Sequence, residues 1–203
     1  MKKKLAIIAG SWVILTAGAA QAADAPYFSV AAGPAWLSDA TLTEGGLSID
    51  ASFDTGYGIT VAAGHSFDAV RAELELGYRK NGIDSFSGFG ASVPGSGDVT
   101  STSVMANLYY DITPKARWSP FLGAGLGLAR VEVDNAAVMG IVIGDAADTV
   151  FAWQLMAGIG CKLTERTTLD LSYRYFATSD PDFSGIEAEY GSHSVMAGVR
   201  VSF

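Results

Sequence analysis

The sequence predicts an all-β fold, namely an eight-stranded antiparallel up-and-down transmembrane β-barrel. Three observations support this prediction. First, apolar residues alternate with polar or small ones, with a period of two, along most of the chain after residue 22. Second, long and short connections between the expected strands alternate strictly, as they do in transmembrane barrels. Third, one face of the expected sheet sets small residues opposite long charged ones, which suits a narrow lumen filled by side chains.

The first 22 residues have the features of a signal peptide. Lys2, Lys3 and Lys4 form a basic start, and a short apolar run over 5–19 follows. Small residues at the end of this segment fit a cleavage site after Ala22. The apolar run is shorter than the roughly 20 residues that a membrane-spanning helix needs. We therefore expect a signal peptide over 1–22 and one barrel domain over 23–203.

Eight strands are expected in the barrel domain. In chain order they cover residues 27–37, 54–67, 70–79, 103–112, 120–133, 150–163, 169–176 and 194–203. The third is the clearest, because Val70, Leu74 and Tyr78 share one face while Arg71 and Glu75 share the other. The fourth, seventh and eighth alternate almost as regularly. The first, second, fifth and sixth follow the same rule less cleanly.

The connections between these strands differ in length. The long ones are rich in polar residues and glycine and cover 38–53, 81–99, 134–149 and 177–193. The short ones are a tight turn at Asp68-Ala69, a turn with Pro114, and residues 164–167. We therefore expect four long loops at the outer surface and short turns at the inner side of the membrane.

The tight turn at Asp68-Ala69 fixes which residues face each other on the second and third strands. It sets Gly64 opposite Glu73 and Ala62 opposite Glu75. Because a small residue leaves room for a long one, this pairing favours a polar face that points into a barrel. A soluble β-sandwich, with its charged face in water, stays as an alternative.

Aromatic residues gather near the expected strand ends, as in the girdles at membrane interfaces. On the inner side these are Tyr27, Phe28, Phe67, Tyr110, Trp118, Phe121 and Phe203. On the outer side they are Trp36, Phe151, Trp153 and Tyr175.

The expected interior carries a set of charged side chains. Its members are Arg71, Glu73, Glu75, Arg79, Lys162, Asp170, Arg174 and Arg200. A turn over 165–167 would set Lys162 directly opposite Asp170. Buried charges must be paired, so this set forms either a salt-bridged plug or the lining of a gated ion conduit. The plug is favoured, because eight strands leave no open bore.

No cofactor, metal or catalytic centre is expected. Cys161 stands alone and has no metal-site spacing, and the glycines over 123–127 lack both the spacing and the following helix of a nucleotide loop. These glycines are expected to make room inside the barrel. His193 is flanked by two serines, but direct neighbours on a strand point to opposite faces, which argues against a lipid-modifying enzyme.

Four segments of the chain resemble the small outer-membrane β-barrels of the opacity-type porin and OmpA-like transmembrane class. They are Asn107–Asp111, Pro120–Gly127, Leu171–Tyr175 and His193–Phe203. The resemblance implies a location in the bacterial outer membrane. It also implies that Val199, Val201 and Phe203 form a C-terminal signal that the barrel-assembly machinery reads. Members of the class serve as adhesins, resistance factors, envelope tethers or narrow channels.

These observations together predict a non-enzymatic protein with a structural or surface-interaction role in adhesion or envelope integrity. The expected partners are outer-membrane lipid, lipopolysaccharide, the assembly machinery and a surface ligand bound through the outer loops. Nucleic acid is not expected, because the formal net charge is −8. A narrow porin-like channel for small solutes and a lipid A-modifying enzyme remain as alternatives.

Overall fold

The computed structural model describes residues 24–38, 40–44, 47–88, 91–138, 141–179 and 190–203. The expected signal peptide lies outside these residues. The strands are β1 (Asp24–Leu37), β2 (Ala40–Glu44), β3 (Leu47–Phe53), β4 (Gly56–Phe67), β5 (Val70–Gly88), β6 (Ala91–Asp111), β7 (Trp118–Val138), β8 (Ile141–Lys162), β9 (Thr167–Thr178) and β10 (Gly191–Ser202). Within the described ranges, no helix has the length and apolar character to cross a membrane.

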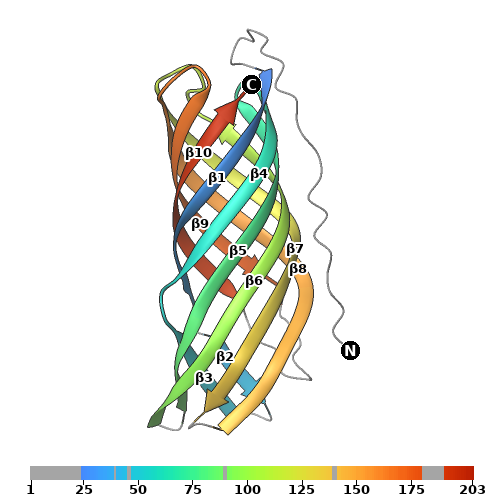
Figure 1. The fold of residues 1–203 in the computed structure, drawn as a ribbon, viewed down its shortest axis with the longest axis vertical. Helices are drawn as coiled ribbons and strands as arrows, with labels where there is room; N and C mark the ends of the chain where they lie inside the picture. Colours follow the sequence, from blue (N-terminus) through green and yellow to red (C-terminus); the bar gives the residue numbers. More distant parts are fainter. Residues whose placement is uncertain (1–23, 39, 45–46, 89–90, 139–140, 180–189) are drawn as a thin grey trace.

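Eight of these strands close into an antiparallel barrel (Figure 1). The barrel wall consists of β1 and β4 to β10, and each of these strands pairs with the next one in chain order. Strands β2 and β3 are not part of the wall, so β1 pairs with β4. Strand β1 also pairs with β10, which closes the cylinder. The closing register sets Tyr27 opposite Ser202 and Trp36 opposite His193. Closure leaves no unpaired edge within the barrel wall, as a lipid environment requires. The predicted eight-stranded barrel is therefore confirmed.

The tight turn between β4 and β5 lies where the sequence predicts it. Asp68 adopts a φ of 53°, a left-handed conformation that aspartate tolerates better than most residues. The register that follows pairs Gly64 with Glu73 and Ala62 with Glu75, as predicted. We call the end with this turn the inner end of the barrel, and the opposite end the outer end.

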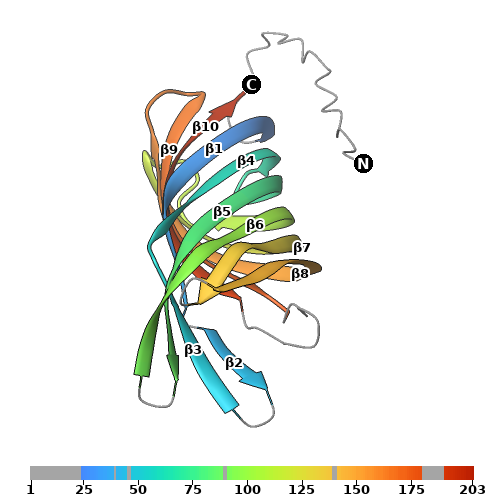
Figure 2. The same cartoon turned by 60° about the horizontal axis from the view of Figure 1, so that its bottom comes forward.

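The outer connections differ from the prediction of four loops. Strands β2 and β3 pair with each other in an antiparallel arrangement. Strand β5 continues to Gly88 and β6 begins at Ala91, while β7 continues to Val138 and β8 begins at Ile141. Figure 2 shows β2, β3 and the long strands projecting beyond the barrel. Glycine- and serine-rich segments have little intrinsic strand preference, but a paired neighbouring strand satisfies their backbone groups. Most of the fourth connection lies outside the described residues.

The apolar rows of the strands face outward and the polar rows face inward. Leu74, Leu108 and Leu126 lie near the middle of the wall and are 59%, 60% and 60% exposed, whereas Glu75 is completely buried. A water-soluble sandwich would show the reverse distribution. Two residues of the predicted inner girdle, Tyr27 and Phe121, instead point inward and are buried, because Gly64 and Gly158 leave space for their rings.

The lumen is apolar toward the outer end, a feature that the sequence analysis missed. This apolar section consists of Leu37, Ile83, Val99, Met105, Ala129, Val131, Ala152, Phe176 and Tyr190. It packs like the core of a soluble domain, so it closes the cylinder above the polar side chains.

Candidate functional site

A buried carboxylate at the middle of the lumen holds several strands together. Glu75 on β5 accepts a hydrogen bond of 2.5 Å from Arg174 on β9 and one of 3.1 Å from Gln154 on β8. The same Gln154 amide donates to Asn107 on β6 at 2.8 Å. A charge-assisted bond of this kind offsets part of the cost of burying both ions.

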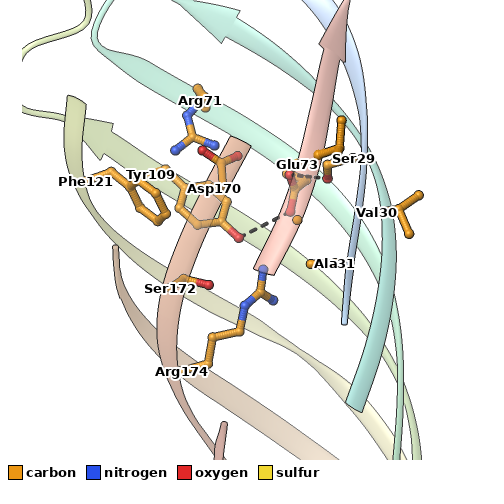
Figure 3. Close-up of a pocket in the computed structure, with 12 residues that line it drawn as sticks. Ser29, Val30, Ala31, Arg71, Glu73, Tyr109, Phe121, Asp170, Ser172 and Arg174 are labelled. Atoms are coloured by element: carbon orange, nitrogen blue, oxygen red, sulfur yellow. Dashed lines mark hydrogen bonds between the residues drawn. The ribbon is translucent and has the colours of Figure 1, made fainter. Parts of the chain in front are cut away.

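A second buried carboxylate lies nearer the inner end, beside a small cavity (Figure 3). Glu73 accepts hydrogen bonds from the hydroxyls of Tyr27, Ser29 and Tyr109 and from the Asn107 amide, at distances of 3.1 to 3.3 Å. Within the described chain it has no cation within ion-pair distance. Hydroxyl and amide donors therefore replace the water that this carboxylate loses on burial.

Two bidentate ion pairs lie toward the inner end. Arg71 donates two hydrogen bonds of 2.9 Å to Asp111. Arg200 donates two of 3.1 Å to Asp170. The Arg71 guanidinium also lies 4.5 Å from the centre of the Tyr109 ring, so an aromatic face covers part of the charge.

Arg79 lies between the polar network and the apolar section of the lumen. Its guanidinium is 3.9 Å from the centre of the Phe176 ring and donates to Ser103 at 3.2 Å and Gln154 at 3.4 Å. The arginines and carboxylates of this network balance in number: Arg71, Arg79, Arg174 and Arg200 against Glu73, Glu75, Asp111 and Asp170. The network therefore carries no excess charge of either sign that would attract ions.

The cavity beside Glu73 has a volume of about 30 Å³. Its lining includes Arg71, Tyr109, Asp170 and Arg174 (Figure 3). A cavity of this size has room for water and is too small for a larger solute.

One member of the predicted interior set lies elsewhere. Lys162 pairs in register with Thr168, and Gly160 rather than Lys162 lies opposite Asp170, so the predicted Lys162–Asp170 contact is wrong. The turn between β8 and β9 is centred one residue earlier than the sequence suggested, and this shift moves every pairing by two. The Lys162 ammonium instead donates to the carbonyl of Pro114 at 2.6 Å, at the inner end.

Sequence reasoning also missed several members of the network. Asp111, Asn107 and Tyr109 lie on the polar row of β6, so the alternation on that strand already marked them as inward-facing. Gln154 is harder to find, because β8 alternates weakly and the neighbours of Gln154 on the inward row, Ala152 and Met156, are apolar. Its role depends on Glu75 and Asn107, which lie far away in the sequence.

The projecting strands form an acidic outer region, which we call the crown. Within the described chain it consists of residues 38, 40–44, 47–56, 80–88, 91–100, 130–138, 141–150, 177–179 and 190–192. Its acidic residues are Glu44, Asp50, Asp54, Asp84, Asp98, Glu132, Asp134, Asp145 and Asp148. Its basic residues are Lys80 and Arg130. Both are already paired, Lys80 with Asp98 at 3.0 Å and Arg130 with Glu132 at 2.8 Å. The hydrogen bond to Asp98 and its negative charge raise the pKa of Lys80.

His193 and its two serine neighbours lie on opposite faces of the barrel wall. Ser192 and Ser194 are buried in the lumen, while the His193 ring lies on the outer wall beside the Tyr173 hydroxyl. The prediction that His193 points to the opposite face from Ser192 and Ser194 is therefore confirmed. Among the described residues, no group of three or more His, Cys, Asp or Glu side chains is arranged to hold a metal ion.

The C-terminal strand lies against the first strand. Val199 and Val201 are exposed on the outer wall, and the Phe203 ring lies 5.4 Å from that of Phe28. Their role as an assembly signal stays a prediction.

A closed barrel with a filled polar lumen and an apolar outer wall defines the class of integral outer-membrane β-barrels. The chain belongs to the outer membrane protein beta-barrel domain family, whose model matches residues 7–203. The protein is thus an outer-membrane protein.

Several individual proteins are similar to this chain. Outer membrane protein PagN of Salmonella typhimurium is 30% identical over 176 residues, which cover 72% of this chain and 73% of PagN. A protein of Rickettsia bellii named as a candidate adhesin is 25% identical over 233 residues, covering 98% of this chain and 99% of the relative. Among solved structures, neisserial surface protein A superposes with a TM-score of 0.56 at 25% identity, covering 87% of this chain and 97% of that one.

Proposed function

We propose that this protein is a non-catalytic surface-interaction protein, in which the barrel is the membrane anchor and the crown binds a partner outside the cell. The observation that carries the proposal is the contrast between the two parts. The lumen is filled by a hydrogen-bonded charged network and by packed apolar side chains, whereas long strands continue beyond the barrel into the crown. Relatives named as adhesins support an adhesive role.

The charge of the crown narrows the chemistry of the partner. Acidic residues greatly outnumber basic ones, and the basic side chains Lys80 and Arg130 already face carboxylates. Such a surface attracts basic protein surfaces and repels polyanions such as sulfated polysaccharides. The proposed partner is therefore a protein with a basic surface.

Adhesion of bacteria that display the chain tests this proposal. The full chain is expressed in a non-adherent strain, and binding to host cells is compared with that of a variant in which Gly-Ser replaces residues 41–52. We expect adhesion with the full chain, its loss in the variant, inhibition by soluble polylysine and no inhibition by heparin.

A wall substitution, Leu74→Ala, is the matched control, because Leu74 faces lipid and lies far from the crown. Heat-modified migration on a gel shows that each variant forms its barrel. Unchanged adhesion in the hairpin variant, or strong competition by heparin, would contradict the proposal.

Assembly of the barrel is part of the same proposal. The exposed side chains of Val199 and Val201, with Phe203 at the end of the outward row, present an apolar strand to the assembly machinery during insertion. Pairing of β1 with β10 then covers the backbone of both strands.

A further inference from the structure

A cluster of aromatic rings around a histidine lies on the outer wall, where β8, β9, β10 and β1 meet. We call Trp36, Trp153, Tyr173, Tyr175 and His193 the histidine cluster. The imidazole of His193 stacks with Trp36 at a centroid distance of 6.3 Å and lies 4.9 Å from the Tyr175 ring. Tyr175 in turn contacts Trp153 at 5.3 Å. The rings come from four strands, so barrel closure is needed to assemble them.

The aliphatic outward row of β10 ends at this cluster. Below His193 the outward row of β10 continues with Val195, Ala197, Val199 and Val201. Register places Trp36, His193 and Tyr175 side by side across neighbouring strands. The surface thus combines an aliphatic wall below with aromatic and polar groups above, which matches an amphiphile whose headgroup lies at the interface.

The imidazole has one nitrogen available for such a headgroup. The Tyr173 hydroxyl occupies Nδ1 at 2.5 Å, and within the described residues no side chain bonds to Nε2. A neutral ring that accepts at Nδ1 carries its proton on Nε2, and a protonated ring does so as well. Nε2 is then a donor that faces outward at headgroup level, flanked by aromatic faces that can stack on a sugar ring.

The other histidine and two cations of the outer end lack this combination. His65, near the inner end, lies 3.3 Å from the Asp24 carboxylate and 3.1 Å from the Ser66 carbonyl, which makes it a poor site for an anion. On the opposite outer wall, Lys80 and Arg130 are already paired with carboxylates.

We propose that the histidine cluster binds the phosphorylated sugar headgroup of lipopolysaccharide in the outer leaflet, with its acyl chains on the aliphatic row below. The aromatic faces stack on the sugar, and Nε2 of His193 donates to a phosphate or hydroxyl oxygen. The proposal depends on insertion into the outer membrane and not on the crown, so it stands even if the crown binds nothing.

The chain contains two histidines, and ¹⁵N-histidine labelling therefore gives two imidazoles to follow. The full barrel is placed in nanodiscs of phosphatidylethanolamine alone, with phosphatidylglycerol, or with lipopolysaccharide. We expect the His193 resonances to shift only with lipopolysaccharide, while those of His65 stay in place. An equal shift with phosphatidylglycerol, equal shifts of both histidines, or no shift would overturn the proposal.

Retention of lipopolysaccharide, measured by native mass spectrometry, gives a second readout. We expect about tenfold weaker retention in His193→Ala, because a hydrogen bond to a charged group is lost. Tyr173→Phe keeps the ring and the fold but frees Nδ1, so we expect a smaller loss. His65→Ala is the matched control and should retain lipopolysaccharide like the wild type. Equal retention in all variants would contradict the proposal.

Discussion

At the scale of single residues, the interior is held by carboxylates that each meet several donors. Glu75 contacts both Arg174 and Gln154, and Glu73 has hydroxyl and amide donors on both oxygens. Removing one partner from such a set leaves a buried group unpaired, which costs far more than the intact interaction contributes. The free energy of unfolding should therefore fall most when a substitution leaves a buried charge without its only counter-ion.

Glu75→Ala tests this sensitivity, because it leaves Arg174 buried without its carboxylate. We expect the free energy of unfolding to fall by about 3–5 kcal/mol. Urea titration of the refolded barrel in vesicles, followed by tryptophan fluorescence, measures the change. The double variant Glu75→Leu/Arg174→Met removes both charges, so its loss should be smaller.

Lys80→Ala is the control for this prediction. Lys80 and Asp98 also form an ion pair, but both side chains are more than a third exposed. We expect a loss below about 1 kcal/mol, because water screens an exposed pair. If Glu75→Ala and Lys80→Ala lowered the free energy of unfolding equally, water would screen the charges inside the lumen, which would contradict a packed interior.

At the scale of the strand, small residues opposite large ones determine how the lumen is filled. Gly123, Gly125 and Gly127 of β7 lie opposite Tyr109, Asn107 and Met105 of β6. A Cβ on Gly125 would collide with the Asn107 side chain. The glycines thus make room for the network, as the sequence analysis predicted.

Gly125→Leu and Ala124→Leu test this arrangement at adjacent positions of one strand. Gly125 lies on the row of β7 that faces the packed lumen, and Ala124 lies on the row that faces lipid. We expect Gly125→Leu to abolish formation of the heat-modifiable folded band. The larger side chain would displace Asn107 and Gln154, which hydrogen bonds hold to each other and to Glu73 and Glu75. Ala124→Leu should fold like the wild type. Normal folding of both variants would refute the inward assignment of the glycines.

The same local rules explain which parts of the fold the sequence could predict. Asp68-Ala69 is a two-residue turn with strong alternation on both sides, so the register of β4 and β5 followed directly. The turn after β8 contains Thr164, whose hydroxyl accepts from the backbone of Arg166 and Thr167, and this local bonding sets a register that alternation alone did not reveal.

The outer strands were missed for a different reason. Residues 81–99 are rich in glycine and serine, yet β5 and β6 stay paired through most of this segment. That pairing depends on two segments that meet only after the turn has formed, so single-strand preference does not predict it. The apolar section of the lumen was missed because Leu37, Val99 and Tyr190 come from expected loops or strand ends.

At the scale of the whole molecule, three zones differ in chemistry: an apolar outer wall, a neutral filled lumen and an acidic crown. The wall anchors the protein in lipid, and the lumen supports the wall. In the proposed function, the crown is the part that meets a partner outside the cell.

The filled lumen predicts that the protein does not conduct ions. The pure protein in a planar bilayer should show no steady openings, because the cavity beside Glu73 holds about 30 Å³ and the apolar section closes the outer half. A porin reconstituted in the same way shows that the assay detects open channels. Regular conductance steps from the pure protein would support the channel alternative and contradict the plug.

The central claim is that the apolar rows face lipid while the polar rows face a closed interior, and methyl NMR in nanodiscs tests it without substitutions. Leu74, Leu108, Leu126 and Leu171 are more than half exposed, whereas Met105, Met156 and Met196 are buried in the lumen. We predict cross-peaks from these leucine methyls to the lipid acyl chains and none from the three methionine methyls. Lipid cross-peaks from the methionines, with the leucines silent, would contradict it.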